Sequence, residues 1–481
     1  LTVITILLLT ITHWVILLLQ IPLFVKNPIW YWEIRFRPLS LWTLLYSIVT
    51  LAALCCAAWF MNARKRPWRS LIIIFIASIW LQFGIGYLEG GGVDALQERY
   101  FRTHHRAYAM LASKNNETII ANIINYEHTL ATFLFTSTKP PGLMTFYIAL
   151  ERLVNGNPAN TLMTEDTRLE RLRNLITFVF PILAAGCIFL LYAFVRKYSL
   201  MTSDSESLIP SYLYILSPNI VLFSLFVDQA VYPSVFLGGA WLVFRLLNKY
   251  SPCSAFVLGI VLYVFAFFSF TILPLFPLAG IFLCLTWWQN RSRVVFFEKV
   301  ISGLAFLSGV VSAYWLFRWI FNYDFLVRFA HTVEVNRRFD FYTRVGIEPI
   351  LSPEPVGVRL QQILNALVWN NLDFAAAVGV AVYLLFAIHG LKLLFRIARR
   401  EAASQEIMLA SVFLSFLILN LGGTAQGEVA RLWIFWVPAV VLFAGRELLH
   451  WKPDKRYPFY ALLLAQFITI ILTFHFQDLR M

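Results

Sequence analysis

Three carboxylates are followed by a group of basic side chains in the stretch Gly86–Ala112 (GYLEGGGVDALQERYFRTHHRAYAMLA). Asp94 and Glu98 are four residues apart, so a helix would place them on one face, and Arg102 and His105 continue that face. A carboxylate beside cations could take a proton from a hydroxyl group while the cations hold an anion. The alternative is an interfacial helix whose charges neutralise one another at i,i+4 spacing.

A second carboxylate, Glu89, competes with Asp94 for the role of base. Glu89 precedes three glycines, which permit a turn that other residues cannot make. The acidic pattern is not a clean pair of carboxylates, so Asp94, Glu89 and Glu98 all remain open. The neighbouring His104 and His105 give only a weak metal signal, and we assign no metal or cofactor.

The run Thr138-Lys139-Pro140-Pro141-Gly142 precedes the apolar stretch LMTFYIALERLV. Two prolines before such a stretch predict a helix start, where proline is tolerated. Helix N-termini attract anions, so Lys139 is a candidate for binding phosphate. The alternative is a rigid turn whose lysine extends its ammonium group toward water.

Three further places put charges beside apolar runs. Asp228 lies between two of them, where a charge is costly and often functional. Arg337 and Arg338 stand among aromatic residues, and arginine suits phosphate through bidentate geometry. Glu428 and Arg431 follow glycines, open an apolar helix and are spaced to pair with each other. In each place the alternative is an ordinary solvated loop or ion pair.

The composition indicates the class of protein in which these charged residues must be positioned. The chain has 481 residues, of which 59% are hydrophobic and 14% charged, and a net charge of +13. Soluble domains carry about 25% charged residues, so the composition excludes an ordinary soluble enzyme or a disordered chain. The positive charge is typical of the cytoplasmic loops of a membrane protein rather than of nucleic-acid binding.

We therefore predict an all-α polytopic membrane protein with about 13 transmembrane helices. The sequence shows no internal repeat, which weakens a transporter interpretation. The predicted spans are 3–25, 40–61, 70–88, 172–194, 208–226, 229–247, 253–270, 271–289, 300–320, 373–394, 406–421, 432–448 and 457–475.

Basic residues predict the orientation of these spans. Short basic loops recur after every second span and fall on one side if the N-terminus is inside and the apolar stretch 139–154 does not cross the membrane. The other side then receives two long loops, 89–171 and 321–372, which we expect to carry short interfacial helices. We therefore expect a multi-pass protein of the cell membrane, in a bacterium the plasma membrane, with its active site facing outside the cytoplasm.

Three short motifs resemble one family of membrane enzymes. They are Lys139-Pro140-Pro141-Gly142, the segment 368–379 (VWNNLDFAAAVG) and the segment 427–438 (GEVARLWIFWVP). Together with the long outer loop they are similar to GT-C type glycosyltransferases, integral-membrane enzymes that use polyprenyl-phosphate sugars, and to their uncharacterised bacterial relatives.

The likeness covers residues 70–450, which would form the transmembrane catalytic core. Residues 1–69 would then be an added N-terminal helix pair, and 451–481 a C-terminal helix. The family usually has its acidic loop after the first span, whereas here it follows the third. If 1–69 is not an addition, Glu33 becomes another candidate for the base.

The resemblance implies an inverting transfer of a hexosyl or pentosyl group from a polyprenyl-phosphate donor to a glycan or lipid acceptor. The catalytic base would be Asp94, with Glu89 second, and a metal is not obligatory because the leaving group is already a phosphate monoester. Membrane lipids are the remaining partners, and nucleic acid is not one. The expected substrate-binding residues are Arg102, His105, Lys139, Asp228, Arg337, Arg338, Glu428 and Arg431.

Two other functions fit parts of the pattern. A polysaccharide polymerase or ligase would also need a large outer loop with arginines, but would use a diphosphate-linked chain. A non-enzymatic lipid or solute transporter would bury charges in mid-span and would tolerate Asp94→Asn better than an enzyme.

Overall fold

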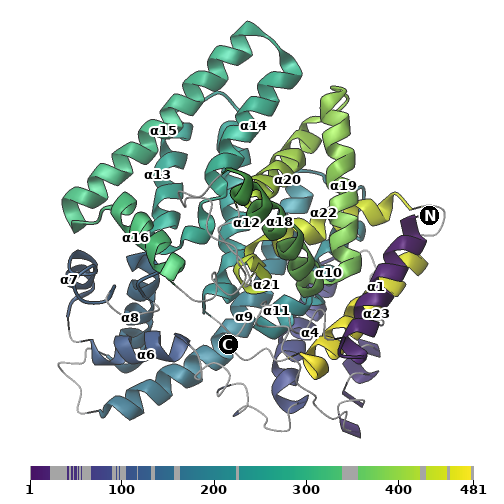
Figure 1. Ribbon diagram of the computed structural model, residues 1–481, viewed down its shortest axis with the longest axis horizontal. Coiled ribbons are helices and arrows are strands. Elements are labelled where there is room, and N and C mark those ends of the chain that lie inside the picture. Colours follow the sequence, from purple (N-terminus) through teal and green to yellow (C-terminus); the bar gives the residue numbers. More distant parts are fainter. Residues whose placement is uncertain are drawn as a thin grey trace.

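Every element in the described part of the computed structural model is a helix (Figure 1). This agrees with the predicted all-α fold class. The described residues are 2–21, scattered positions within 41–56, 67–88, 94, 97, 104–115, 117–131, 136–156, 163–223, 227–338, 356–422, 429–451 and 456–477.

Eight helical stretches of the described chain are long and apolar enough to cross a membrane. Two shorter apolar helices, α1 (Thr2–Leu18) and α13 (Pro252–Phe268), accompany them. The protein is therefore a helical membrane protein, while the number of thirteen spans stays a prediction. The eight involve α4 (Pro67–Leu88), α9 (Glu165–Lys197), α12 (Val227–Leu247), α14 (Leu275–Asn290) with the turn before it, α15 (Arg293–Phe321), α19 (Val380–Ala398), α20 (Ser404–Gly422) and α23 (Arg456–Phe476).

Helix α15 has one lipid-like face and one packed face. Leu304, Trp315 and Trp319 are exposed, as expected where the surroundings are hydrocarbon. On the packed face, Gly309 meets Gly259 of α13, and a Cβ on either glycine would overlap backbone of the other helix. Small residues of this kind allow membrane helices to approach closely.

The stretch 208–226, predicted as one span, is interrupted. It contains the short helices α10 (Ile209–Ile215) and α11 (Pro218–Phe223), while residues 224–226 lie outside the described part. Pro218 has no N–H to donate, and it disfavours helical geometry at the residue before it. The chain therefore turns between the two helices.

The predicted span 373–394 begins later than expected. Helix α18 (Val356–Val378) ends where Gly379 adopts a φ of 93°, and α19 starts at Val380. A positive φ is easily adopted only by glycine, so the helix breaks there. Asp373 consequently lies in the last turns of α18, before the break.

Gln466 of α23 joins this break to the break between α10 and α11. Its Nε2 donates to the carbonyl of Val378 at 2.7 Å and to that of Leu216 at 3.4 Å. Backbone groups inside a membrane protein need such internal partners because lipid offers none.

The two long polar segments fold into short helices that lie at the left of Figure 1, α16 above the other three. They are α6 (His104–Lys114), α7 (Ile119–Ile124) and α8 (Pro141–Asn155) from the first segment, and α16 (Phe325–Arg338) from the second. The predicted loop 321–372 is thus largely helical where it is described. The turns between α14 and α15 and between α19 and α20, both predicted basic loops, lie together at the top of the view.

Candidate functional site

The turn before α8 is held by a buried tyrosine. The Tyr126 hydroxyl lies 2.9 Å from the carbonyl oxygen of Thr136 and 3.2 Å from that of Lys139, so it donates to this turn. Pro140 and Pro141 then open α8, which confirms the helix start predicted from this motif. Lys139 therefore stands directly before a helix N-terminus, where an anion is favoured.

Arg328 of α16 brings the second polar segment onto the same turn. Its side chain is fully buried, and its guanidinium donates to Glu127 Oε2 at 2.9 Å and to the carbonyl of Ser137. His331, one turn later, has its Nδ1 3.8 Å from the same carboxylate oxygen. Two segments about 200 residues apart in sequence are thereby joined.

Several donors near this contact have no partner among the described residues. They are the Nε of Arg328 and the hydroxyls of Tyr323 and Thr332, all buried. Burial raises the pKa of both Tyr126 and Tyr323, so their phenols stay protonated and remain donors. Buried donors without acceptors are costly, which makes this region suited to accept an oxygen-rich ligand. We call Tyr126, Glu127, Lys139, Arg328 and His331 the Arg328 cluster.

A second polar cluster forms around the peptide of Ala430 in α21 (Val429–Leu432). Asp373 Oδ2 accepts its N–H at 2.9 Å, and Asn219 Nδ2 donates to its carbonyl at 3.4 Å. Arg431 follows directly and is also buried. We call Asn219, Asp373, Ala430 and Arg431 the Asp373 cluster, which unites both segments 368–379 and 427–438 that carry the resemblance.

The sequence left Asn371 without an assigned role, but it supports the Asp373 cluster from the side. Its Oδ1 accepts from the Tyr383 hydroxyl and from Asn420 Nδ2, the latter at 2.9 Å. This ties α18 to α19 and α20 close to Asp373.

A buried ion pair fixes α8 against α9. Arg168 Nε donates to Glu151 Oε1 at 2.8 Å, and its Nη2 contacts the same oxygen. Asn155 adds a bond to the Arg168 carbonyl at 2.9 Å. The pair therefore sets the direction of α8 and, with it, the position of its N-terminus.

Only some of the predicted site residues lie in the described part of the structure. Lys139 belongs to the Arg328 cluster and Arg431 to the Asp373 cluster, while Asp94 is helical and exposed. Glu89, Arg102 and Glu428 lie outside the described residues. The backbone of four others lies in helices, but their side chains are outside the described part; these are His105 in α6, Asp228 in α12, and Arg337 and Arg338 in α16.

Sequence reasoning missed Tyr126, Glu127 and Arg328. Arg328 lies one helical turn before His331, so a helical interpretation of 325–338 would have placed both on one face. Nothing in the sequence indicates that Glu127 is their partner.

The comparisons with known proteins add no family. No protein-family model matches the chain, and no curated protein matches it at a significant level.

Proposed function

We propose that the protein transfers a sugar from a polyprenyl-phosphate donor to a glycan or lipid acceptor at the outer face of the membrane. The observation that supports this most is the contact of Arg328 with Glu127 and the Ser137 carbonyl. The mechanism needs both polar segments to share one site, and this contact brings them together next to Lys139.

The donor phosphate would bind at the N-terminus of α8. Pro140 and Pro141 contribute no N–H, so the first backbone donors are those of Gly142 and Leu143. Lys139 adds a full positive charge there, and the helix dipole favours an anion. The apolar surface between spans would hold the prenyl chain.

The reaction is a single displacement. A carboxylate removes the proton from the acceptor hydroxyl, whose oxygen forms a bond to the anomeric carbon of the sugar. The bond from that carbon to the phosphate oxygen breaks, and its electron pair leaves on the polyprenyl phosphate. The proton stays on the carboxylate, and the cations stabilise the charge that develops on the phosphate. The configuration at the anomeric carbon inverts.

Asp94 remains the proposed base because its side chain is exposed on the first segment, where an acceptor could reach it. Glu127 is a competitor, since its carboxylate lies in the Arg328 cluster. Arg328, however, already occupies one of its two carboxylate oxygens.

The test uses the purified full chain in lipid nanodiscs with a panel of polyprenyl-phosphate sugars and candidate acceptors. Asp94→Asn, Glu127→Gln and Lys139→Ala are compared with the wild type for transfer and for donor binding. Matched controls are Asp166→Asn and Lys114→Ala, which change exposed charges of the same segment.

We expect Asp94→Asn to lose at least about 100-fold in turnover while still binding donor, as for a lost general base. Lys139→Ala should weaken donor binding instead. If only Glu127→Gln loses turnover, the base is Glu127. If wild type binds none of the phosphate donors but turns over diphosphate-linked chains, the protein is a polymerase or ligase.

A lipid or solute transporter is the second candidate, favoured by the two helix breaks that Gln466 joins. Discontinuous helices near buried charges are typical of transporter binding sites. Uptake or scrambling by protein in liposomes, unchanged in Asp94→Asn and without sugar transfer, would favour this function over the transferase.

A further inference from the structure

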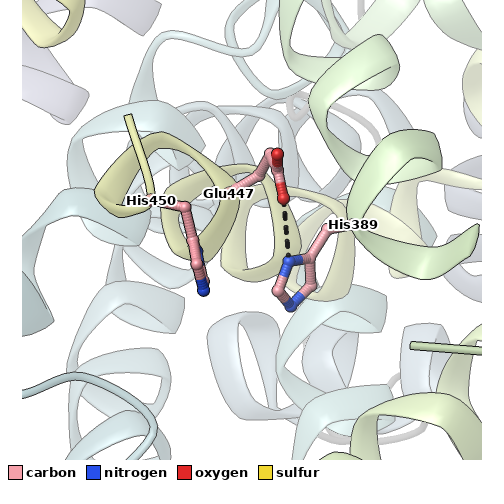
Figure 2. Close-up of side chains that lie close together, drawn as sticks. All are labelled: His389, Glu447 and His450. Carbon is pink, nitrogen blue, oxygen red and sulfur yellow. Dashed lines mark hydrogen bonds and ion pairs between the residues drawn. The ribbon is translucent and has the colours of Figure 1, made fainter. Parts of the chain in front are cut away.

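Two histidines and a glutamate meet where α19 packs against α22 (Val437–Leu449) (Figure 2). His389 lies in the middle of α19, Glu447 in the last turn of α22, and His450 caps that helix. His389 and Glu447 are buried, whereas His450 is exposed. One ligand atom from each of the three lies within 4.8 Å of the others.

The hydrogen bonds of His450 determine which of its nitrogens is available. Its Nδ1 lies 2.7 Å from the carbonyl oxygen of Arg446. A carbonyl only accepts, so Nδ1 carries the proton, and Nε2 of the neutral ring presents a lone pair.

His389 has the same arrangement. Its Nδ1 lies 3.2 Å from Glu447 Oε2, while Glu447 Oε1 accepts from the Lys392 ammonium group. A carboxylate paired with an ammonium group accepts hydrogen bonds, so Nδ1 of His389 is the donor. His389 Nε2 is buried and has no partner among the described residues.

We propose that His389 and His450 bind a divalent transition metal ion, of which Zn²⁺ is the representative, through their Nε2 atoms. Metal-binding histidines nearly always donate their other N–H to a carboxylate or backbone carbonyl, which is what Glu447 and Arg446 accept here. Imidazole nitrogen is a preferred ligand of such ions, and it needs no negative charge.

The rings of His389 and His450 lie close together. The two imidazole rings are 5.8 Å apart between centroids, and Figure 2 shows them side by side. Ligand atoms around zinc are roughly 3.3 Å apart, and the exposed His450 ring can adjust to that spacing when the ion binds. Water completes the shell on the exposed side of His450.

This site is separate from the proposed transferase site and does not depend on it. His389 lies nine residues beyond the start of α19 at Val380, about 14 Å along the helix from the break next to the Asp373 cluster.

The experiment measures Zn²⁺ binding to the purified full chain in nanodiscs, stripped of metal beforehand, by calorimetry. Co²⁺ serves as a second probe, because its visible absorption reports tetrahedral coordination. The variants are His389→Gln and His450→Gln. The controls are His128→Gln, which changes an exposed histidine elsewhere, and the double variant His104→Gln with His105→Gln.

We expect one Zn²⁺ per wild-type chain, affinity reduced at least about tenfold in each site variant, and no change in the controls. His450 is exposed, so its variant should fold even if His389→Gln does not. Wild type without stoichiometric Zn²⁺ binding would overturn the proposal. So would full binding by His450→Gln, or loss of binding only in the His104/His105 variant.

Discussion

The helices of the two polar segments contain two Arg–Glu pairs with similar chemistry and different surroundings. In the Glu151–Arg168 pair both side chains are buried, at 0% and 5% exposed. In the Glu127–Arg328 pair the arginine is 0% exposed, but the glutamate is 38% exposed. The first pair joins neighbouring helices of one segment, and the second joins two segments that are distant in sequence.

The difference separates a structural pair from one that is placed for binding. Glu151 is fully enclosed, so its pair can only hold α8 and α9 together. Glu127 faces water on one side, so a ligand can reach it and the turn that Arg328 contacts. The Glu151–Arg168 pair orients α8. The Glu127–Arg328 pair lies beside the turn that precedes the N-terminus of the same helix.

The largest effect should come from breaking the enclosed pair with Arg168→Met. The free energy of unfolding should fall by about 3–5 kcal/mol, because the Glu151 charge is left buried without a partner. Equilibrium unfolding in mixed micelles measures this. The double variant with Glu151→Leu should recover most of the loss; no recovery would show that the pair is not what holds α8.

Breaking the open pair with Arg328→Met should cost less stability, about 1–2 kcal/mol. Water reaching Glu127 screens the charge that remains, so the value for a buried pair must be discounted. Donor-dependent transfer should nevertheless fall at least tenfold, because the two segments lose this polar contact. A variant as unstable as Arg168→Met, or one with normal transfer, would contradict the distinction between the pairs.

The hydrogen bonds of Gln466, which is uncharged, test whether the stability losses of the two Arg–Glu pairs depend on charge. Gln466→Leu keeps the side-chain volume but leaves the Val378 and Leu216 carbonyls without this donor. We expect a loss of about 1 kcal/mol, the usual size for a hydrogen bond between membrane helices. Thermal unfolding, compared with that of Gln466→Glu, measures this loss of stability. A loss greater than that of Arg328→Met would contradict the expected ranking of the variants by stability.

The smallest effect should come from a fully open pair. Lys114 and Glu165 are 3.3 Å apart with both side chains about half exposed. Lys114→Ala should change the free energy of unfolding by less than about 0.5 kcal/mol, since water screens both charges. The change is measured in the same micelles at physiological salt. A larger change would mean that solvent exposure does not determine how much each pair contributes to stability.

Much of the fold could be predicted from the sequence, because the length of an apolar stretch determines whether it can cross a membrane. The stretches near 70–88, 172–194, 229–247 and 457–475 all lie within observed helices. The break after Val378 was missed because Gly379 sits within a continuous apolar run, and hydropathy does not detect a single positive φ. Pro218 was a visible signal for the other break, but the surrounding apolar residues concealed it.

The candidate site was predictable only where it depends on neighbours in sequence. Pro140-Pro141 fixes a local helix start, so Lys139 could be placed before it. The pairing of Arg328 with Glu127 depends on how two distant segments pack, and nothing local specifies it. The roles of Asp94 and Arg431 stay predictions, since neither position reveals a reaction by itself.

Gln466 also has a consequence for the order of synthesis. The carbonyls of Leu216 and Val378 belong to segments made well before α23 leaves the ribosome. Until that helix inserts, both breaks lack the donor that this side chain supplies. The neighbourhood of Asn219 and Asp373 therefore reaches its final form late in biogenesis, and a nascent chain stopped before residue 456 would hold its spans without a completed site.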